Sequence, residues 1–94
     1  MPELNTLVLK DELLVIMAEE AGEVTQECMK LVRCPKNGTQ RLTDELGDML
    51  CMIYLAVDND LISWASLTER VKVKEHKLKI WSSLYEQVTG EEND

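Results

Sequence analysis

The chain has 94 residues, of which 30% are charged, and its formal net charge at pH 7 is −8. This length fits a single domain, residues 1–94, with a core of modest size. The acidic charge excludes the nucleic-acid and anionic-membrane binding that basic surfaces support, and the longest apolar run, residues 49–57, is too short to cross a bilayer.

The first predicted helix covers roughly residues 5–33. Its apolar residues recur at steps of three and four, as one face of an α-helix requires. The weakly patterned stretch around residue 10 leaves open a break there, and Pro35 and Gly38 predict the end of the helix in residues 34–38. The residues that define the apolar face are Leu13, Met17, Ala21, Val24, Cys28 and Leu31.

The second predicted helix begins with Thr39 or Thr43 as its N-cap and runs to about Asn59. Its segment 49–57, MLCMIYLAV, is apolar on every side, which predicts burial all round. A single short chain has too few helices to surround it. We therefore expect a homodimer or homotetramer that completes the core between subunits.

The third predicted helix begins after Ser63, a typical N-cap residue, and reaches about Val88, with frayed residues beyond it. No stretch is typical of a β-strand. The predicted fold class is therefore all-α, a helical bundle completed by homo-oligomerisation.

The cysteines and the N-terminus indicate the compartment. The three cysteines, Cys28, Cys34 and Cys51, form no CxxC pair and accompany no histidine cluster, which indicates reduced thiols. The N-terminal residues include acids and lack the basic start of a signal peptide. We expect a cytoplasmic protein.

Two pairs of acids stand out on the first two helices. Glu20 and Glu23 are three residues apart, and so are Glu45 and Asp48, so each pair leaves one face of its helix. Two antiparallel helices joined by a short loop can bring the pairs face to face. Four carboxylates in a partly dry cleft repel one another and require a counter-charge.

A hard divalent cation with oxygen ligands supplies that counter-charge, and Mg²⁺ suits carboxylates well, with Mn²⁺ as a second choice. The alternative is a solvated acidic helix face, which is the usual meaning of such a run. Because Glu45 and Asp48 stand directly before the apolar segment, they favour the metal site.

The same acids carry a resemblance to a known family. Glu19-Glu20-x-x-Glu23 is followed, after 21 residues, by Glu45-x-x-Asp48. This arrangement resembles the EExxE…ExxD signature of the MazG-like all-α nucleoside triphosphate pyrophosphohydrolases. The resemblance covers about residues 13–81.

The resemblance implies a Mg²⁺-dependent cleavage of nucleoside triphosphates to the monophosphate and pyrophosphate. Glu20, Glu23, Glu45 and Asp48 match the family's metal ligands, and Glu19 matches an additional acid that binds the metal or supports its ligands. A carboxylate of the cluster, Glu20 or Glu23, is expected to orient or deprotonate the attacking water.

Further residues are expected to contact the substrate. Asp58 matches an aspartate of the dCTP-pyrophosphatase branch, and Lys77 matches a basic position that meets the phosphates. Lys74 lies on the same helical face as Lys77, with Trp81 one turn further on, where its ring can stack on a base. The alternative is that Lys74 and Lys77 form a solvated basic face of the third predicted helix.

Two other functions stay open. Phosphoribosyl-ATP pyrophosphohydrolase is a similarly short member of the group, but its acidic motif tends to continue into a Tyr-His pair, and no histidine follows Tyr54 here. A non-catalytic helical dimerisation or regulatory module would use the acids only for solubility.

Overall fold

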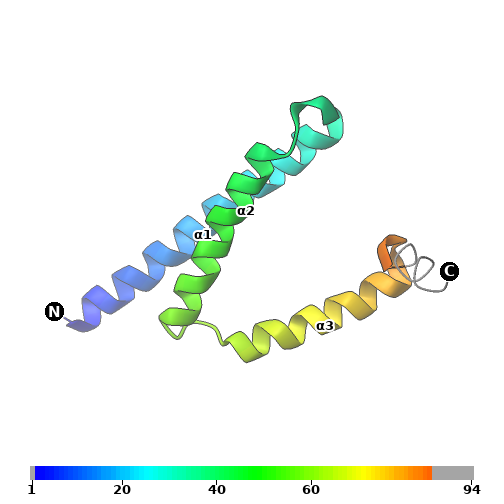
Figure 1. The fold of residues 1–94 in the computed structure, drawn as a ribbon. Coiled ribbons are helices and arrows are strands. Elements are labelled where there is room, and N and C mark those ends of the chain that lie inside the picture. Colours follow the sequence, from blue (N-terminus) through cyan, green and yellow to red (C-terminus); the bar gives the residue numbers. More distant parts are fainter. Residues whose placement is uncertain (1, 86–94) are drawn as a thin grey trace. The chain divides into compact units, whose positions relative to one another are not determined.

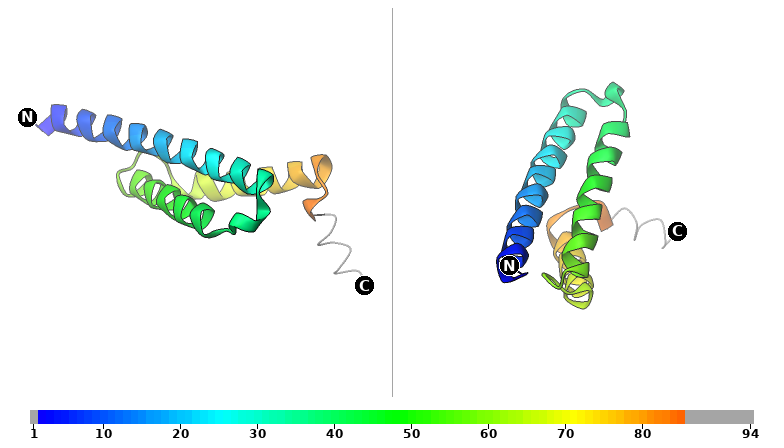
Figure 2. Two further views of the ribbon diagram at one scale, coloured as in Figure 1. Left: turned by 90° about the horizontal axis from the view of Figure 1, so that it is seen from above. Right: turned by 90° about the vertical axis from the view of Figure 1, so that its left-hand side faces the viewer.

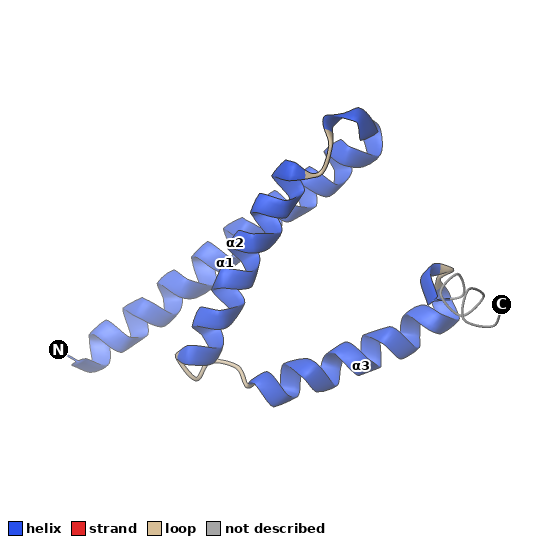
Figure 3. Cartoon of the chain, in the orientation of Figure 1, coloured by secondary structure: helices blue, strands red, loops and turns tan. Residues whose placement is uncertain are grey.

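The computed structural model describes the backbone of residues 2–85 and the side chains of residues 8–85. This part of the chain forms three α-helices, α1 (Pro2–Arg33), α2 (Gln40–Asp58) and α3 (Trp64–Trp81), and contains no strand (Figures 1 and 3). The predicted all-α class is confirmed. α1 continues through residue 10 without a break. None of the helices described has the combination of length and apolarity needed to cross a membrane.

The chain divides into two units, one ending at Leu61 and the other beginning at Ile62. The first unit is a hairpin in which α1 and α2 lie side by side and antiparallel (Figure 2). Its core consists of Leu13 on α1 and of Met52 and Ala56 on α2. Three half-buried residues, Ile16, Met17 and Leu61, pack against these three and complete the apolar contact.

The connection between α1 and α2 follows from its proline and glycine. After α1 ends, the Cys34 amide donates to the carbonyl of Lys30 at 2.8 Å, and a short 3₁₀ turn covers Pro35–Asn37. Gly38 then adopts a φ of 78°, a left-handed conformation that glycine accepts without a steric penalty. Thr39 occupies the N-cap position of α2, although its side chain makes no capping hydrogen bond.

The C-terminal end of α2 is a Schellman turn. The amide of Leu61 donates to the carbonyl of Ala56 at 2.9 Å, and the amide of Asp60 donates to the carbonyl of Val57 at 3.0 Å. Asp60 takes the left-handed conformation that this motif requires, with a φ of 59°. The turn brings Leu61 back against the core of the hairpin, so the end of the helix also contributes packing.

The hairpin covers only one side of α2. Of the residues on this helix, Met52 and Ala56 are buried, whereas Leu46, Leu50 and Tyr54 keep 44–50% of their surface exposed. The sequence predicts that the apolar segment of α2 is buried on every side. The hairpin alone does not bury it in this way, because a single neighbouring helix contacts a single face.

α3 begins as predicted and ends earlier than predicted. The side chain of Ser63 caps its N-terminus by accepting from the Ser66 amide at 3.0 Å. The predicted continuity of this helix to about Val88 is wrong, since α3 ends at Trp81, and Val88 itself lies outside the described residues. Ser82 follows in an extended conformation, and its hydroxyl donates to the Leu78 carbonyl at 2.8 Å. A serine that binds a nearby backbone carbonyl competes with helix continuation.

Ala56 sets the distance between the two helices of the hairpin, because it is fully buried and small. Ala56→Leu should lower the free energy of unfolding by roughly 1–3 kcal/mol, since extra methyl groups in a packed contact force the neighbouring side chains apart. Urea unfolding followed by circular dichroism measures the change. Ala65→Leu places the same substitution at an exposed position of α3 and should change stability by less than about 0.5 kcal/mol. Equal effects of the two substitutions would contradict the packing described for Ala56.

Candidate metal centre

The packing of α1 against α2 brings acidic side chains from both helices together. Glu20 and Glu23 follow the apolar contact along α1, and Glu45 and Asp48 precede it on the antiparallel α2. One carboxylate oxygen from each of Glu20, Glu45 and Asp48 lies within 4.8 Å of the other two. The two helices therefore meet through their acidic pairs, as the spacing of these residues predicts.

The cluster lies at the edge of the contact between the helices, partly removed from water. Glu20 and Glu45 are half-buried, whereas Asp48 is exposed. The Oε2 atoms of Glu20 and of Glu45 are buried and have no hydrogen-bond partner. A buried carboxylate oxygen without a donor is unfavourable, so each of these two atoms requires a proton or a cation.

The electrostatic repulsion within the cluster raises the pKa of both Glu45 and Glu20. The pKa of Glu45 rises from 4.5 to about 7, first because a hydrogen bond with Glu23 favours the protonated form. Desolvation and the repulsion of the neighbouring carboxylates act in the same direction. The pKa of Glu20 is also raised, mainly by desolvation and then by the charges of Glu23 and Asp48. Without a cation, the cluster therefore holds a proton more tightly than ordinary carboxyl groups do.

The donor set fits a hard divalent cation. It consists of carboxylate oxygens alone, which are the ligands of Mg²⁺ and Mn²⁺, and it contains none of the nitrogen or sulfur atoms that zinc prefers. Two oxygens bound to the same magnesium at about 2.1 Å lie at most about 4.2 Å apart. Small rotations of the carboxylates from their separation of up to 4.8 Å bring them into that range. Glu20, Glu45 and Asp48 are the residues that would hold the ion.

The remaining acids of the motif surround this group. Glu23 is exposed and lies close enough to Glu45 to share a hydrogen bond with it. Glu19 is exposed and contributes a weaker repulsion that raises the pKa of Glu20. Two turns further along α1, Glu27 accepts from the Lys30 ammonium at 3.3 Å, so this acid is neutralised within the chain.

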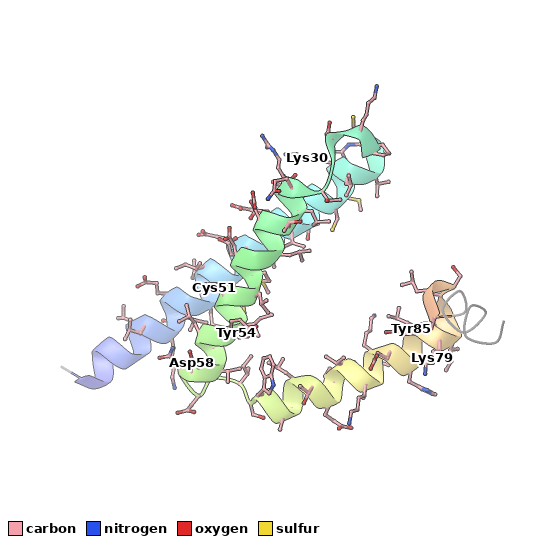
Figure 4. All side chains as sticks on the ribbon, in the orientation of Figure 1. Lys30, Cys51, Tyr54, Asp58, Lys79 and Tyr85 are labelled. Atoms are coloured by element: carbon pink, nitrogen blue, oxygen red, sulfur yellow. The ribbon has the colours of Figure 1, made fainter. Side chains whose placement is uncertain are left out.

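The residues predicted to contact substrate belong to the end of α2 and to α3. Asp58 is the last residue of α2 (Figure 4), ten residues beyond Asp48 and therefore about 15 Å away along the helix axis. Lys74, Lys77 and Trp81 belong to α3, in the second unit, and share one face of that helix. All three are exposed, Trp81 by 82% of its surface. The structure does not bring Asp58 into the carboxylate cluster.

An apolar groove adjoins the cluster, and the sequence patterns above do not predict it. Its volume is about 370 Å³, and it begins one turn from the acids, since Ile16 precedes Glu20 by four residues and Met52 follows Asp48 by four. The apolar steps from Leu9 to Leu13 and Ile16 are the sequence signal that could have indicated it. The lining residues are Leu9, Lys10, Glu12, Leu13, Ile16, Met52, Leu55, Asn59 and Leu61.

Comparisons of the chain with models of protein families, with curated proteins and with solved structures give no match.

The raised pKa of Glu45 predicts a particular pH dependence of stability in metal-free buffer. Between its ordinary value of 4.5 and about 7, the folded chain keeps a proton that the unfolded chain has released. Raising the pH through this window therefore destabilises the folded state. The melting temperature, measured by calorimetry with a chelator present, should fall from about pH 5 to about pH 7.5.

Glu45→Gln removes the titrating group and keeps its size, so it should flatten this pH dependence and raise the melting temperature at the upper end. Glu69→Gln changes an exposed acid on α3 and should retain the slope of the parent protein. A melting temperature of the parent that rises over this window, or identical slopes for both variants, would show that the carboxylates do not interact.

Proposed function

We propose that the chain is a Mg²⁺-dependent nucleoside triphosphate pyrophosphohydrolase of the MazG-like type, releasing pyrophosphate and the nucleoside monophosphate. The observation that carries the proposal is the group of carboxylates from two antiparallel helices, with two buried oxygens that lack a partner. The EExxE…ExxD arrangement of Glu19, Glu20, Glu23, Glu45 and Asp48 supports it from the sequence.

An acidic centre is suited to a triphosphate substrate only through cations. The triphosphate and the carboxylates repel each other directly, so their association depends on positive charge between them. Bound magnesium or manganese neutralises the carboxylates and polarises the phosphate oxygens. The role of Glu20, Glu45 and Asp48 is to hold this charge on a rigid pair of helices.

The proposed reaction is the attack of water on the α-phosphorus. The new bond joins the water oxygen to this phosphorus, the bond from the α-phosphorus to the bridging oxygen breaks, and pyrophosphate leaves with the bonding electrons. Glu20 or Glu23 orients the water and accepts its proton. Glu23 suits this role because it is exposed yet lies within hydrogen-bonding reach of the cluster. Catalysis then rests on positioning and electrostatic stabilisation.

The apolar groove offers a surface for the nucleobase, because it begins one turn from the carboxylates. Lys74 and Lys77 would contact the phosphates, Trp81 would stack on the base, and Asp58 would contact the nucleotide. We further propose that the enzyme acts as a homodimer or homotetramer in the cytoplasm.

The direct test is product analysis with a panel of nucleoside and deoxynucleoside triphosphates. With Mg²⁺ or Mn²⁺, phosphorus NMR should show pyrophosphate and monophosphate in equal amounts, and a chelator should stop the reaction. The panel should include phosphoribosyl-ATP. If that substrate alone is cleaved, the protein is a phosphoribosyl-ATP pyrophosphohydrolase. No cleavage of any substrate, in the presence of either metal, would favour a non-catalytic helical module.

A matched pair of variants on α2 tests the site itself. Asp48→Asn removes one charged ligand at an exposed position and should lower the rate by a factor of about 100 or more. Asp44→Asn makes the same change one turn earlier, at a residue that accepts from Gln40 at 2.8 Å and lies outside the cluster. Its rate should stay within about twofold of the parent. Similar losses in both variants would contradict the assignment of Asp48.

A further inference from the structure

The loop between α1 and α2 contains an asparagine followed by a glycine, Asn37-Gly38, which takes no part in the carboxylate cluster or the apolar groove. Asn37 is exposed and ends the 3₁₀ turn. Its side-chain amide has no hydrogen-bond partner within the described residues, whereas asparagine in a loop commonly binds the backbone nearby. The Cγ atom of Asn37 is therefore free to approach the backbone that follows it.

The nitrogen of Gly38 is the backbone atom that can react with this Cγ atom. A bond between the two closes a five-membered ring, whose other members are the backbone carbonyl carbon, the Cα and the Cβ of Asn37. Glycine has no Cβ beside its nitrogen, so no side chain of residue 38 hinders the approach. The Gly38 amide donates to the Pro35 carbonyl at 3.3 Å, longer than the usual range of about 2.7–3.2 Å, so only a weak hydrogen bond opposes ring closure.

The surroundings of the loop favour a negative charge on this nitrogen. A hollow of about 610 Å³ is lined by the Asn37-Gly38 pair together with Lys30 and Arg41. Lys30 is paired with Glu27, but Arg41 has no ion-pair partner within the described residues. The Gly38 nitrogen must lose its proton before it attacks, and a nearby positive charge favours the negatively charged form. Since Asn37 is exposed, water also has access to the ring.

We propose that Asn37 is a site of covalent modification, at which the asparagine converts to aspartate and isoaspartate with water as the only co-reactant. The Gly38 nitrogen gives up its proton and bonds to Cγ of Asn37, the bond from Cγ to Nδ2 breaks, and Nδ2 leaves with that proton as ammonia. Water then opens the cyclic imide. Addition at Cγ gives aspartate, whereas addition at the backbone carbonyl gives isoaspartate, in which the main chain passes through Cγ. The conversion does not depend on the enzymatic function.

Asn59 provides a comparison within the same chain, because it is also exposed and lacks the other features. Its side-chain amide donates to the Leu55 carbonyl at 2.8 Å, which holds it at the end of α2. The next residue is Asp60, whose Cβ lies beside the nitrogen, and the Asp60 amide donates to the Val57 carbonyl at 3.0 Å. Ring closure at Asn59 therefore requires the end of the helix to open first.

The conversion changes the charge of the hollow and leaves the helices intact. The charged residues in the stretch 30–41 are all basic, so the new carboxylate is attracted to its surroundings. Asn37 lies outside α1 and α2, so their backbone hydrogen bonds are not interrupted. We expect the converted chain to keep its helical content, which circular dichroism measures.

The test follows the folded protein by mass spectrometry of tryptic peptides, after incubation in mildly alkaline buffer made with heavy-oxygen water. The label marks only the conversion that occurs during the incubation. Trypsin separates the two sites, since Asn37 falls in peptide 37–41 and Asn59 in peptide 42–70. Peptide 37–41 should take up label and separate into two products of equal mass, the aspartyl and isoaspartyl forms. It should convert at least about ten times faster than peptide 42–70.

Asn37→Gln is the matched control, because it keeps the amide but would have to close a six-membered ring, and its peptide 37–41 should stay unlabelled. In urea, the parent chain should convert at Asn37 within about threefold of its folded rate, whereas conversion at Asn59 should increase. Label in the urea-unfolded chain but not in peptide 37–41 of the folded protein would overturn the proposal, because the loop would then protect Asn37. Equal labelling of both peptides in the folded protein, or no labelling in either state, would overturn it as well.

Discussion

The contact of α1 with α2 through Leu13, Met52 and Ala56 is the interaction on which the candidate site depends. This contact is apolar and does not compensate any charge, yet it holds carboxylate oxygens of the two helices within 4.8 Å of one another. The attraction between the apolar groups therefore works against the repulsion between the carboxylates. A cation that binds only the folded state would remove this conflict and stabilise the hairpin by mass action.

The acidic cluster was largely predictable because it depends on short-range geometry. Each acidic pair has a spacing of three residues, so both of its members leave one face of their helix. The short loop with Pro35 and Gly38 makes the two helices antiparallel neighbours, which places the two pairs close together. The sequence could not show how the members differ. Glu20 and Glu45 each bury one oxygen, and Glu23 lies outside the closest group, because these details depend on how deeply each side chain sits between the helices.

Other features depended on interactions that periodicity does not report. The N-cap Ser63 was predictable, since a capping hydrogen bond is local and has a known residue preference. The end of α3 was not, because the apolar pattern continues past Trp81 while the Ser82 side chain binds the Leu78 carbonyl. Likewise, the apolar segment of α2 predicts that other helices pack against it. How much of this segment a single chain buries depends on the number of neighbouring helices, which the pattern does not report.

The loop from Cys34 to Thr39 also determines which evolutionary changes the hairpin tolerates. The distance along the chain from Glu20 to Glu45 is divided among a helix, this loop and the first turn of another helix. Lengthening the loop leaves both helices in register, and the added loop-closure entropy is small. One residue inserted between Asp48 and Met52 instead rotates the acids by about 100° relative to the apolar contact. Changes in chain length are therefore compatible with this site in the loop, but not between the acids and the apolar contact of the same helix.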